Sequence, residues 1–221
     1  MQFKVILTIS FLIISVAGYS QVKNAFRESQ EIAAMEAKAA GLRQETLMAA
    51  GNFSKASTNF DINYLDCKWI VDPGVRYIQG SVKTGFTITE RTNLITFDLA
   101  DELKVDSIRF RTSKISHYRP FDNSVIVNLG IFLDKGNKDA VEIFYHGIPP
   151  VTTPISSFTT SAHAGVPVLW TLSEPYGGRD WWPCKNGLND KADSLDISIT
   201  TPDKYTSSTN GILQSDVVVG G

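Results

Sequence analysis

The alternation of apolar and polar residues that begins near Phe60 constrains this chain more than any other feature. From Leu65 to Val71 nearly every second residue is large and apolar, and the sequence Asp72-Pro73-Gly74 that follows is typical of a turn. A period of two is the pattern of a β-strand with one buried face. We therefore predict that this part of the chain is built from β-strands.

The same alternation predicts a series of short strands after this turn. Tyr77–Glu90 alternates with a slip of phase in its middle, which predicts a β-bulge at Gly85. Many short strands at near-regular spacing favour an antiparallel β-sandwich or a saddle-shaped sheet, so we predict a mainly β domain at 60–221. The further strands are expected at Leu94–Leu99, Val105–Arg111, Ser124–Leu129, Ala140–Tyr145, Val166–Leu172, Ser194–Thr200 and Tyr205–Gly211.

The start of the chain has the pattern of a signal peptide. Lys4 precedes the apolar run Val5–Val16, and the small residues Gly18 and Ser20 follow it, which predicts cleavage after residue 20. The run is shorter than the ~20 residues that a transmembrane helix needs, so we expect no stable membrane span. We expect export to the periplasm, the medium or the cell surface.

Composition adds three limits. Residues 21–51 contain no proline and many strong helix formers, which predicts a helical segment ahead of the β-domain. The formal net charge of −2 gives no electrostatic reason to expect nucleic acid as a partner. Export would permit a disulfide between Cys67 and Cys184, but free cysteine behaves as a small core hydrophobe, so we favour two buried thiols.

The most informative segment is Trp170–Cys184, which contains three of the four tryptophans. It follows an irregular stretch, Pro149–Val166, whose length is typical of functional loops. Because Glu174 precedes a proline, its backbone is biased toward an extended conformation. A fixed carboxylate beside aromatic side chains can hold a cation. The plainer interpretation is a loop glutamate that forms an ion pair with Arg179.

Several pieces of the chain, in a fixed order, carry a family resemblance. They are Val71–Gly80, Ile95–Asp98, Glu174-Pro175 with Arg179, Pro183-Cys184, Lys191-Ala192, Leu195–Ile199, Thr201–Tyr205 and Ser208–Gly211. Together they resemble the amino-terminal domain of M1 zinc aminopeptidases, from about Phe60 to the end of the chain. The chain departs from the pattern at Lys185–Leu188, where the family commonly has Phe-Asp-Glu-Pro.

The resemblance implies a role for four residues. In M1 enzymes the residue that matches Glu174 binds the free α-ammonium group of the peptide substrate. Leu172 would help to line the pocket for the first side chain, and Tyr176 and Arg179 are the further substrate-binding candidates. The implied partner is therefore the N terminus of a peptide, bound in the context of a catalytic domain.

The resemblance also implies zinc in the parent enzyme, bound by a His-Glu-x-x-His helix. His117, His146 and His163 do not have that spacing, so we predict no catalytic residue, no metal site and no cofactor in this chain. We expect the chain to end inside the family's amino-terminal domain and to lack peptidase activity by itself.

An alternative from another functional class is a non-enzymatic β-sandwich that binds cell-surface glycan or protein. Tyr176, Trp181 and Trp182 would form its stacking platform. Trp182→Ala would abolish binding to such a ligand, whereas an aminopeptidase domain would show no binding to oligosaccharide.

Overall fold

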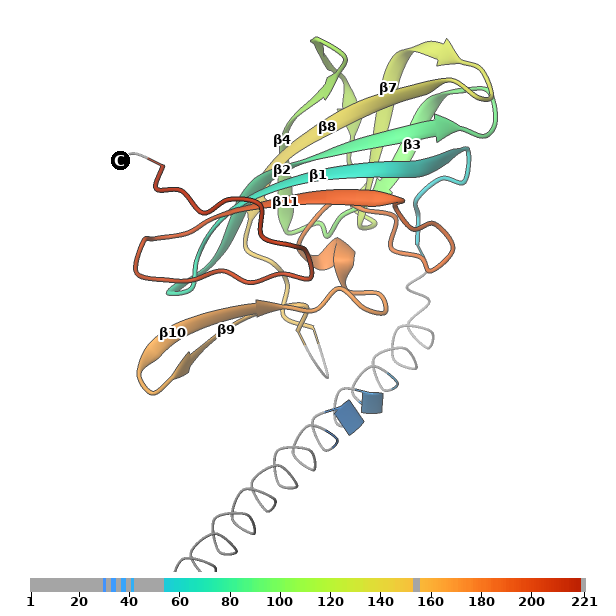
Figure 1. Cartoon of the computed structure of the whole chain (residues 1–221). Helices are drawn as coiled ribbons and strands as arrows, with labels where there is room; N and C mark the ends of the chain where they lie inside the picture. The colour runs from blue at the N-terminus through green and yellow to red at the C-terminus, as the bar shows by residue number, and fades with distance from the viewer. Residues whose placement is uncertain are drawn as a thin grey trace, which may run out of the picture.

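The computed structural model describes residues 54–152 and 156–219, together with the isolated positions Gln30, Ala33, Ala34, Ala37, Lys38 and Gly41. The predicted signal peptide at 1–20 and nearly all of the predicted helical segment at 21–51 lie outside these residues. Between 54 and 219 the chain consists mainly of β-strands, as predicted (Figure 1).

The strands form three sheets. A six-stranded sheet has the order β11-β1-β2-β8-β4-β5, a three-stranded sheet the order β3-β7-β6, and β9 and β10 pair separately. Their bounds are β1 (Phe60–Asp72), β2 (Val75–Ile88), β3 (Thr92–Asp98), β4 (Leu103–Phe110), β5 (Ser113–Ile115), β6 (His117–Tyr118), β7 (Ser124–Leu133), β8 (Lys138–Gly147), β9 (Phe158–His163), β10 (Val166–Thr171) and β11 (Ser194–Thr200).

The long hairpin of β1 and β2 follows from the alternation and the Asp72-Pro73-Gly74 turn. The predicted slip of phase in β2 is wrong. Every second residue from Val82 to Ile88 is buried, including the polar Thr84, so β2 keeps a single inner face. The irregularity lies in β1 instead, between Ile62 and Tyr64, where the partner strand reaches Gly85.

One hydrophobic core is shared by the six-stranded and three-stranded sheets. The ring of Phe60 in β1 lies 5.8 Å from that of Phe86 in β2 and 5.3 Å from that of Phe97 in β3. Because the inner faces of two sheets supply these rings, burying them joins the sheets into one unit. Its largest fully buried side chains include Tyr145, Phe60, Phe86, Phe97, Phe158, Ile78, Ile95, Leu103 and Ile143.

Three expectations about the strands need correction. β11 pairs with β1 in parallel, so the sheet is not wholly antiparallel. The stretch expected to be irregular contains β9, which forms a hairpin with β10. Tyr205–Gly211 forms no strand, although a turn does occur just before it, where the Tyr205 N–H donates to the Pro202 carbonyl at 3.0 Å.

The β9–β10 hairpin projects from the main sheets, with only its first residue, Phe158, in the shared core, and it leads directly into the loop that contains Glu174 (Figure 1). Its two-residue turn has positive φ at Ala164 (48°) and Gly165 (80°), which suits a tight hairpin. β10 therefore delivers the chain to the candidate site at a defined position.

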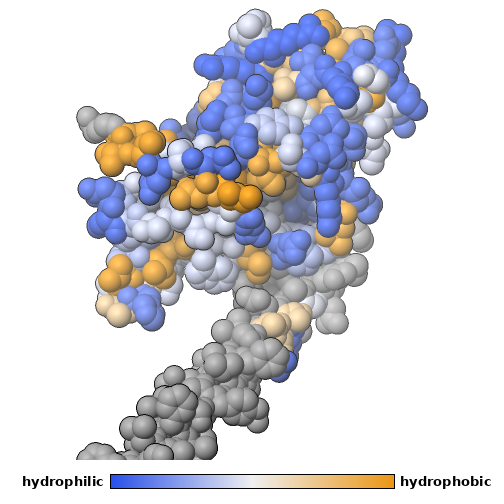
Figure 2. Space-filling model, in the orientation of Figure 1, coloured by the Kyte–Doolittle hydropathy of each residue, from blue (hydrophilic) through white to orange (hydrophobic). Residues whose placement is uncertain are grey.

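Apolar side chains gather on the face of the molecule shown in Figure 2, over β10 and over the segment after β11. The exposed members are Val166, Val168, Trp170, Ile212, Leu213, Val217, Val218 and Val219. Exposed apolar groups of this kind often mark contact surfaces. In the part of the chain that the structure describes, no helix has the length and apolar character to cross a bilayer.

Candidate functional site

Glu174 lies at the tip of a tight turn directly after β10. The Leu172 N–H donates to the Ser157 carbonyl at 2.9 Å, and the Gly177 N–H donates to the Ser173 carbonyl at 2.7 Å, which closes the turn. The Glu174–Pro175 peptide bond is cis. The turn thus has a backbone hydrogen bond at its entrance and another across its base.

The Glu174 side chain is exposed. Within 54–152 and 156–219 its carboxylate makes no hydrogen bond or ion pair, so the plainer expectation, a pair with Arg179, is not what the structure contains. A carboxylate with no internal partner remains able to accept hydrogen bonds from an external cation. Leu172 and Tyr176, on either side of it, are half-buried.

A short buried segment supports the turn from below. The chain forms the 3₁₀ turn η1 (Gly178–Asp180), in which Arg179 is 5% and Asp180 6% exposed. A Cβ atom added to Gly178 would lie 3.0 Å from Cys184 Sγ, so a larger residue would have to push the two segments slightly apart. Ser157 Oγ donates to the Asp180 carboxylate at 2.5 Å, which ties η1 to the start of the β9 segment.

Aromatic side chains attach the loop to the sheet core. Trp181 is 7% exposed, and its ring lies 4.7 Å from that of Trp69 in β1. Trp69 Nε1 donates to the Tyr145 hydroxyl at 3.0 Å, and this hydroxyl donates to the Trp181 carbonyl at 2.9 Å. Burial raises the pKa of Tyr145, so the hydroxyl keeps its proton and remains a donor. Trp182 Nε1 reaches back to Ser173 Oγ at 3.4 Å.

The buried carboxylate of Asp98 joins the loop to β3. The backbones of Asp98 and Cys184 exchange two hydrogen bonds, of 2.8 and 3.0 Å. The Asp98 carboxylate accepts from the Asn186 N–H at 2.8 Å, from Ser54 Oγ at 2.5 Å and from the Lys55 N–H at 2.5 Å. Three donors satisfy a charge that would otherwise be costly to bury.

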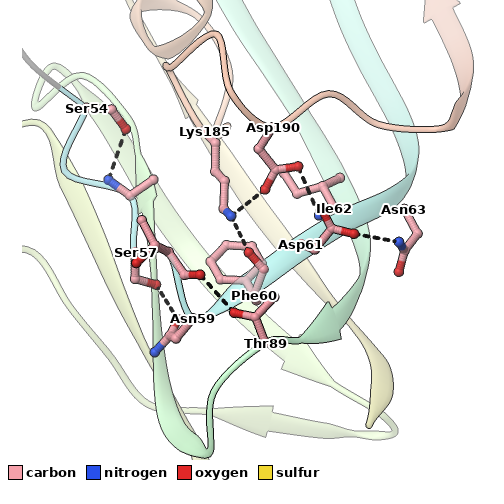
Figure 3. A network of polar contacts seen from close by, with 12 residues as sticks. Ser54, Ser57, Asn59, Phe60, Asp61, Ile62, Asn63, Thr89, Lys185 and Asp190 are labelled. Atoms are coloured by element: carbon pink, nitrogen blue, oxygen red, sulfur yellow. Dashed lines mark hydrogen bonds and ion pairs between the residues drawn. The ribbon is translucent and has the colours of Figure 1, made fainter. Parts of the chain in front are cut away.

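A part-buried ion pair holds the other end of the loop, at the point where the sequence departs from the family pattern (Figure 3). Lys185 Nζ donates to the Asp190 carboxylate and to the Phe60 carbonyl, and it lies 3.9 Å from the centre of the Phe60 ring. Asp190 also accepts from the Ile62 N–H at 3.2 Å. The loop is therefore attached to the start of β1 by residues that sequence reasoning did not select.

No histidine lies in the loop at 172–190, and its cysteine, Cys184, is buried. His163 lies at the opposite end of the β9–β10 hairpin from Glu174. Among the described residues no group of three or more His, Cys, Asp and Glu side chains could hold a metal ion. Cys67 and Cys184 are both buried and free, as expected. Burial raises the pKa of both thiols, which keeps them protonated and unreactive.

Solved structures of M1 zinc metallopeptidases share this fold. No protein-family profile matches the chain, and no curated protein sequence matches it. An M1 zinc metallopeptidase from Deinococcus radiodurans is similar with a TM-score of 0.67 and 21% identity, over 74% of this chain and 37% of that one. A mutant of an M1 zinc metallopeptidase from the same organism, bound to a Tyr-Ser-Ala substrate, has a TM-score of 0.66 and 22% identity, over 74% and 38%.

A more distant neighbour is leukotriene A4 hydrolase from Saccharomyces cerevisiae, with a TM-score of 0.55 and 16% identity over 67% of this chain and 24% of that one. The present chain thus spans well under half the length of these proteins. At such identities the similarity shows a shared fold and does not define the chemistry of this chain.

Proposed function

We propose that this chain is the substrate-anchoring amino-terminal domain of an exported zinc aminopeptidase of the M1 family. The observation that carries the proposal is the Glu174 carboxylate, which is exposed and has no partner among the described residues, on a turn that leads into buried residues. The fold, shared with M1 zinc metallopeptidases over 74% of the chain, supports the same assignment.

The chemistry follows from charge and geometry. A peptide's free α-ammonium group is a cation with three donors, and the Glu174 carboxylate can accept them. A charge-assisted hydrogen bond contributes roughly 1.5–3 kcal/mol where water is excluded and under about 1 kcal/mol at an exposed site, so this contact alone gives weak binding. Anchoring by Glu174 would therefore set the register of a peptide more than its overall affinity.

The other site residues either contact the substrate or support the turn in this proposal. Leu172 and Tyr176 are half-buried beside Glu174 and can contact the first side chain of the peptide. Arg179 is buried and its backbone groups hold the turn, so we assign it support of the turn and no contact with substrate. Zinc and the hydrolytic step would belong to a catalytic domain, for which exposed Val166, Val168 and Trp170 offer a contact surface along β10, the strand that leads to Glu174.

Tyr176, Trp181 and Trp182 do not form the open aromatic platform that the glycan-binding alternative requires. Trp181 is buried against Trp69, and Trp182 is half-buried at a ring distance of 6.3 Å from Trp69. A sugar ring needs an open aromatic face, and of the three aromatics only Tyr176 lies outside this cluster. We therefore retain peptide anchoring as the single proposed function.

Titration of the chain with the peptide Tyr-Ser-Ala, followed by NMR chemical shifts, tests the anchoring role. We expect weak binding with shifts centred on residues 173–177, no binding of the N-acetylated peptide, and loss of binding in Glu174→Ala. Glu90→Ala is the matched control, since Glu90 is an exposed glutamate at the end of β2. Equal binding of the free and acetylated peptides would refute the proposal.

Export is a separate part of the proposal and rests on the sequence of residues 1–20. We expect the mature protein from an exporting host to begin at Gln21, which the intact mass measures directly. A protein recovered with its first 20 residues attached would contradict cleavage at this position.

A further inference from the structure

Asn186 uses both ends of its side-chain amide inside the loop. It is 6% exposed; its Nδ2 donates to the Tyr176 carbonyl at 2.8 Å, and its Oδ1 accepts from the Arg179 N–H at 3.2 Å. The orientation of the amide is set by its surroundings, because a carbonyl demands a donor and an N–H demands an acceptor. The side chain therefore bridges the two ends of the backbone from 176 to 179.

We propose that Asn186 is a positioning residue for Glu174, and this inference rests on the proposed anchoring function. Glu174 has no hydrogen bond of its own among the described residues, so its place depends on the backbone around it. The Tyr176 carbonyl, two residues further on, is held only through Asn186 in the described part of the chain. Asn186 in turn is held by its N–H, which donates to Asp98 Oδ2 in β3.

This arrangement links the exposed turn to the rigid sheet. Asp98 is fully buried and its backbone pairs with Cys184, so it is a fixed point. From there one chain of contacts runs through Asn186 to Tyr176 and so to the turn that presents Glu174. A contact that fixes the turn before a ligand arrives lowers the entropy lost on binding.

An amide is needed at position 186 because it must donate and accept at once. An ionised carboxylate cannot donate to the Tyr176 carbonyl, whereas a protonated one can. In Asn186→Asp the new carboxyl group would also lie near the buried Asp98 carboxylate, and each would oppose the other's ionisation. The other charged or titratable groups around this position are Arg179, which favours ionisation, and Asp180 and Cys184.

Amide hydrogen exchange measured by NMR on the full chain tests the positioning role. In Asn186→Leu, which removes both hydrogen bonds at similar volume, we expect the Gly177 and Arg179 amides to exchange about 10- to 100-fold faster. The Val82 and Ile143 amides lie in the core strands. Their exchange should change only by one common factor, the factor by which the variant changes global unfolding. In Asn186→Asp we expect the fast exchange at about pH 7.5 and nearly wild-type exchange at about pH 5, after correction for intrinsic rates.

Asn189→Asp is the matched control, because Asn189 is exposed in the same loop. It should leave the Gly177 and Arg179 amides unchanged at both pH values. Equal acceleration of all amides in Asn186→Leu would mean that Asn186 contributes only to global stability, and wild-type exchange at Gly177 and Arg179 would mean that it does not hold the turn. Either result overturns the inference.

Binding of Tyr-Ser-Ala separates this inference from the proposed function. If the wild-type chain binds the peptide, Asn186→Leu should weaken binding several-fold, and unchanged binding overturns the positioning role while anchoring by Glu174 stands. If the wild-type chain shows no binding, the anchoring proposal fails, and the exchange rates still decide whether Asn186 holds the turn.

Discussion

The sheet core and the loop at 172–190 both contain buried side chains, but different interactions stabilise them. In the core, aromatic and aliphatic side chains from two sheets fill space, as the Phe60, Phe86 and Phe97 rings do. In the loop, buried polar groups satisfy one another, as Asp98 and Asn186 do. The core tolerates variation that keeps volume and period, whereas the loop depends on individual donors and acceptors.

The difference explains where function can reside. A core of packed apolar side chains cannot contain an unpaired charge, because the free-energy cost of burying that charge is too high. A loop in which most buried polar groups are satisfied, Trp181 Nε1 excepted, can leave the Glu174 carboxylate exposed and without a partner among the described residues. Changes in the core should therefore affect the whole fold, and changes in the loop should affect the site first.

The largest effect is expected from Phe97→Ala. The side chain is fully buried and contacts Phe60, so its removal leaves a cavity between the two sheets and should lower the free energy of unfolding by about 3–5 kcal/mol. Urea unfolding followed by circular dichroism measures this change. Leu94→Ala, in the same strand but exposed, is the control and should cost under about 1 kcal/mol. Similar losses of unfolding free energy in Phe97→Ala and Leu94→Ala would contradict the placement of Phe97 in the core.

A somewhat smaller effect is expected from Lys185→Met in the loop. It leaves the Asp190 carboxylate, 16% exposed, without its cation, so the free energy of unfolding should fall by about 3 kcal/mol. The double variant Lys185→Met, Asp190→Asn removes the unpaired charge and should recover much of that loss. Lys191→Met, at an exposed lysine nearby, should have little effect. If Lys185→Met behaves like Lys191→Met, the loop is not held by this pair.

The smallest effect is a pH dependence that belongs to the core. Burial raises the pKa of the Cys67 thiol from 9.0 to about 12. The folded protein therefore holds this proton more tightly than the unfolded chain, so stability is fully present below pH 9 and declines as the pH rises toward 12. Between about pH 8 and pH 10.5 the contribution of Cys67 should fall by about 2 kcal/mol.

Comparison with Cys67→Ala isolates this contribution, because Cys184 and Tyr145 act in the same direction in both proteins. Urea unfolding of both proteins at the two pH values provides the measurement. The variant should lose about 2 kcal/mol less than the wild type over this range. If the free energy of unfolding falls by the same amount in the wild type and in Cys67→Ala, burial does not protect the Cys67 thiol from ionisation.

The sequence alone predicted the strands wherever the signal is local. Alternation located β1, the β1–β2 turn and most later strands, and the composition of Trp170–Cys184 selected the segment that carries the candidate site. It failed at Thr84, because a polar residue on an inner face breaks the apparent period. It also missed β9, whose Thr- and Ser-rich sequence lacks the apolar alternation of a half-buried strand.

Tertiary structure decided the rest. The parallel pairing of β11 with β1, the Lys185–Asp190 pair beneath Phe60, and the hold of Asp98 on Asn186 all join residues from separate strands and loops. Local patterns report how each residue relates to its sequence neighbours, whereas these contacts form only when distant segments are buried together. The sequence by itself thus determined a β-domain with a carboxylate at residue 174. Only the folded chain decided that this carboxylate lies exposed on a turn, with no partner in the part of the chain that the structure describes.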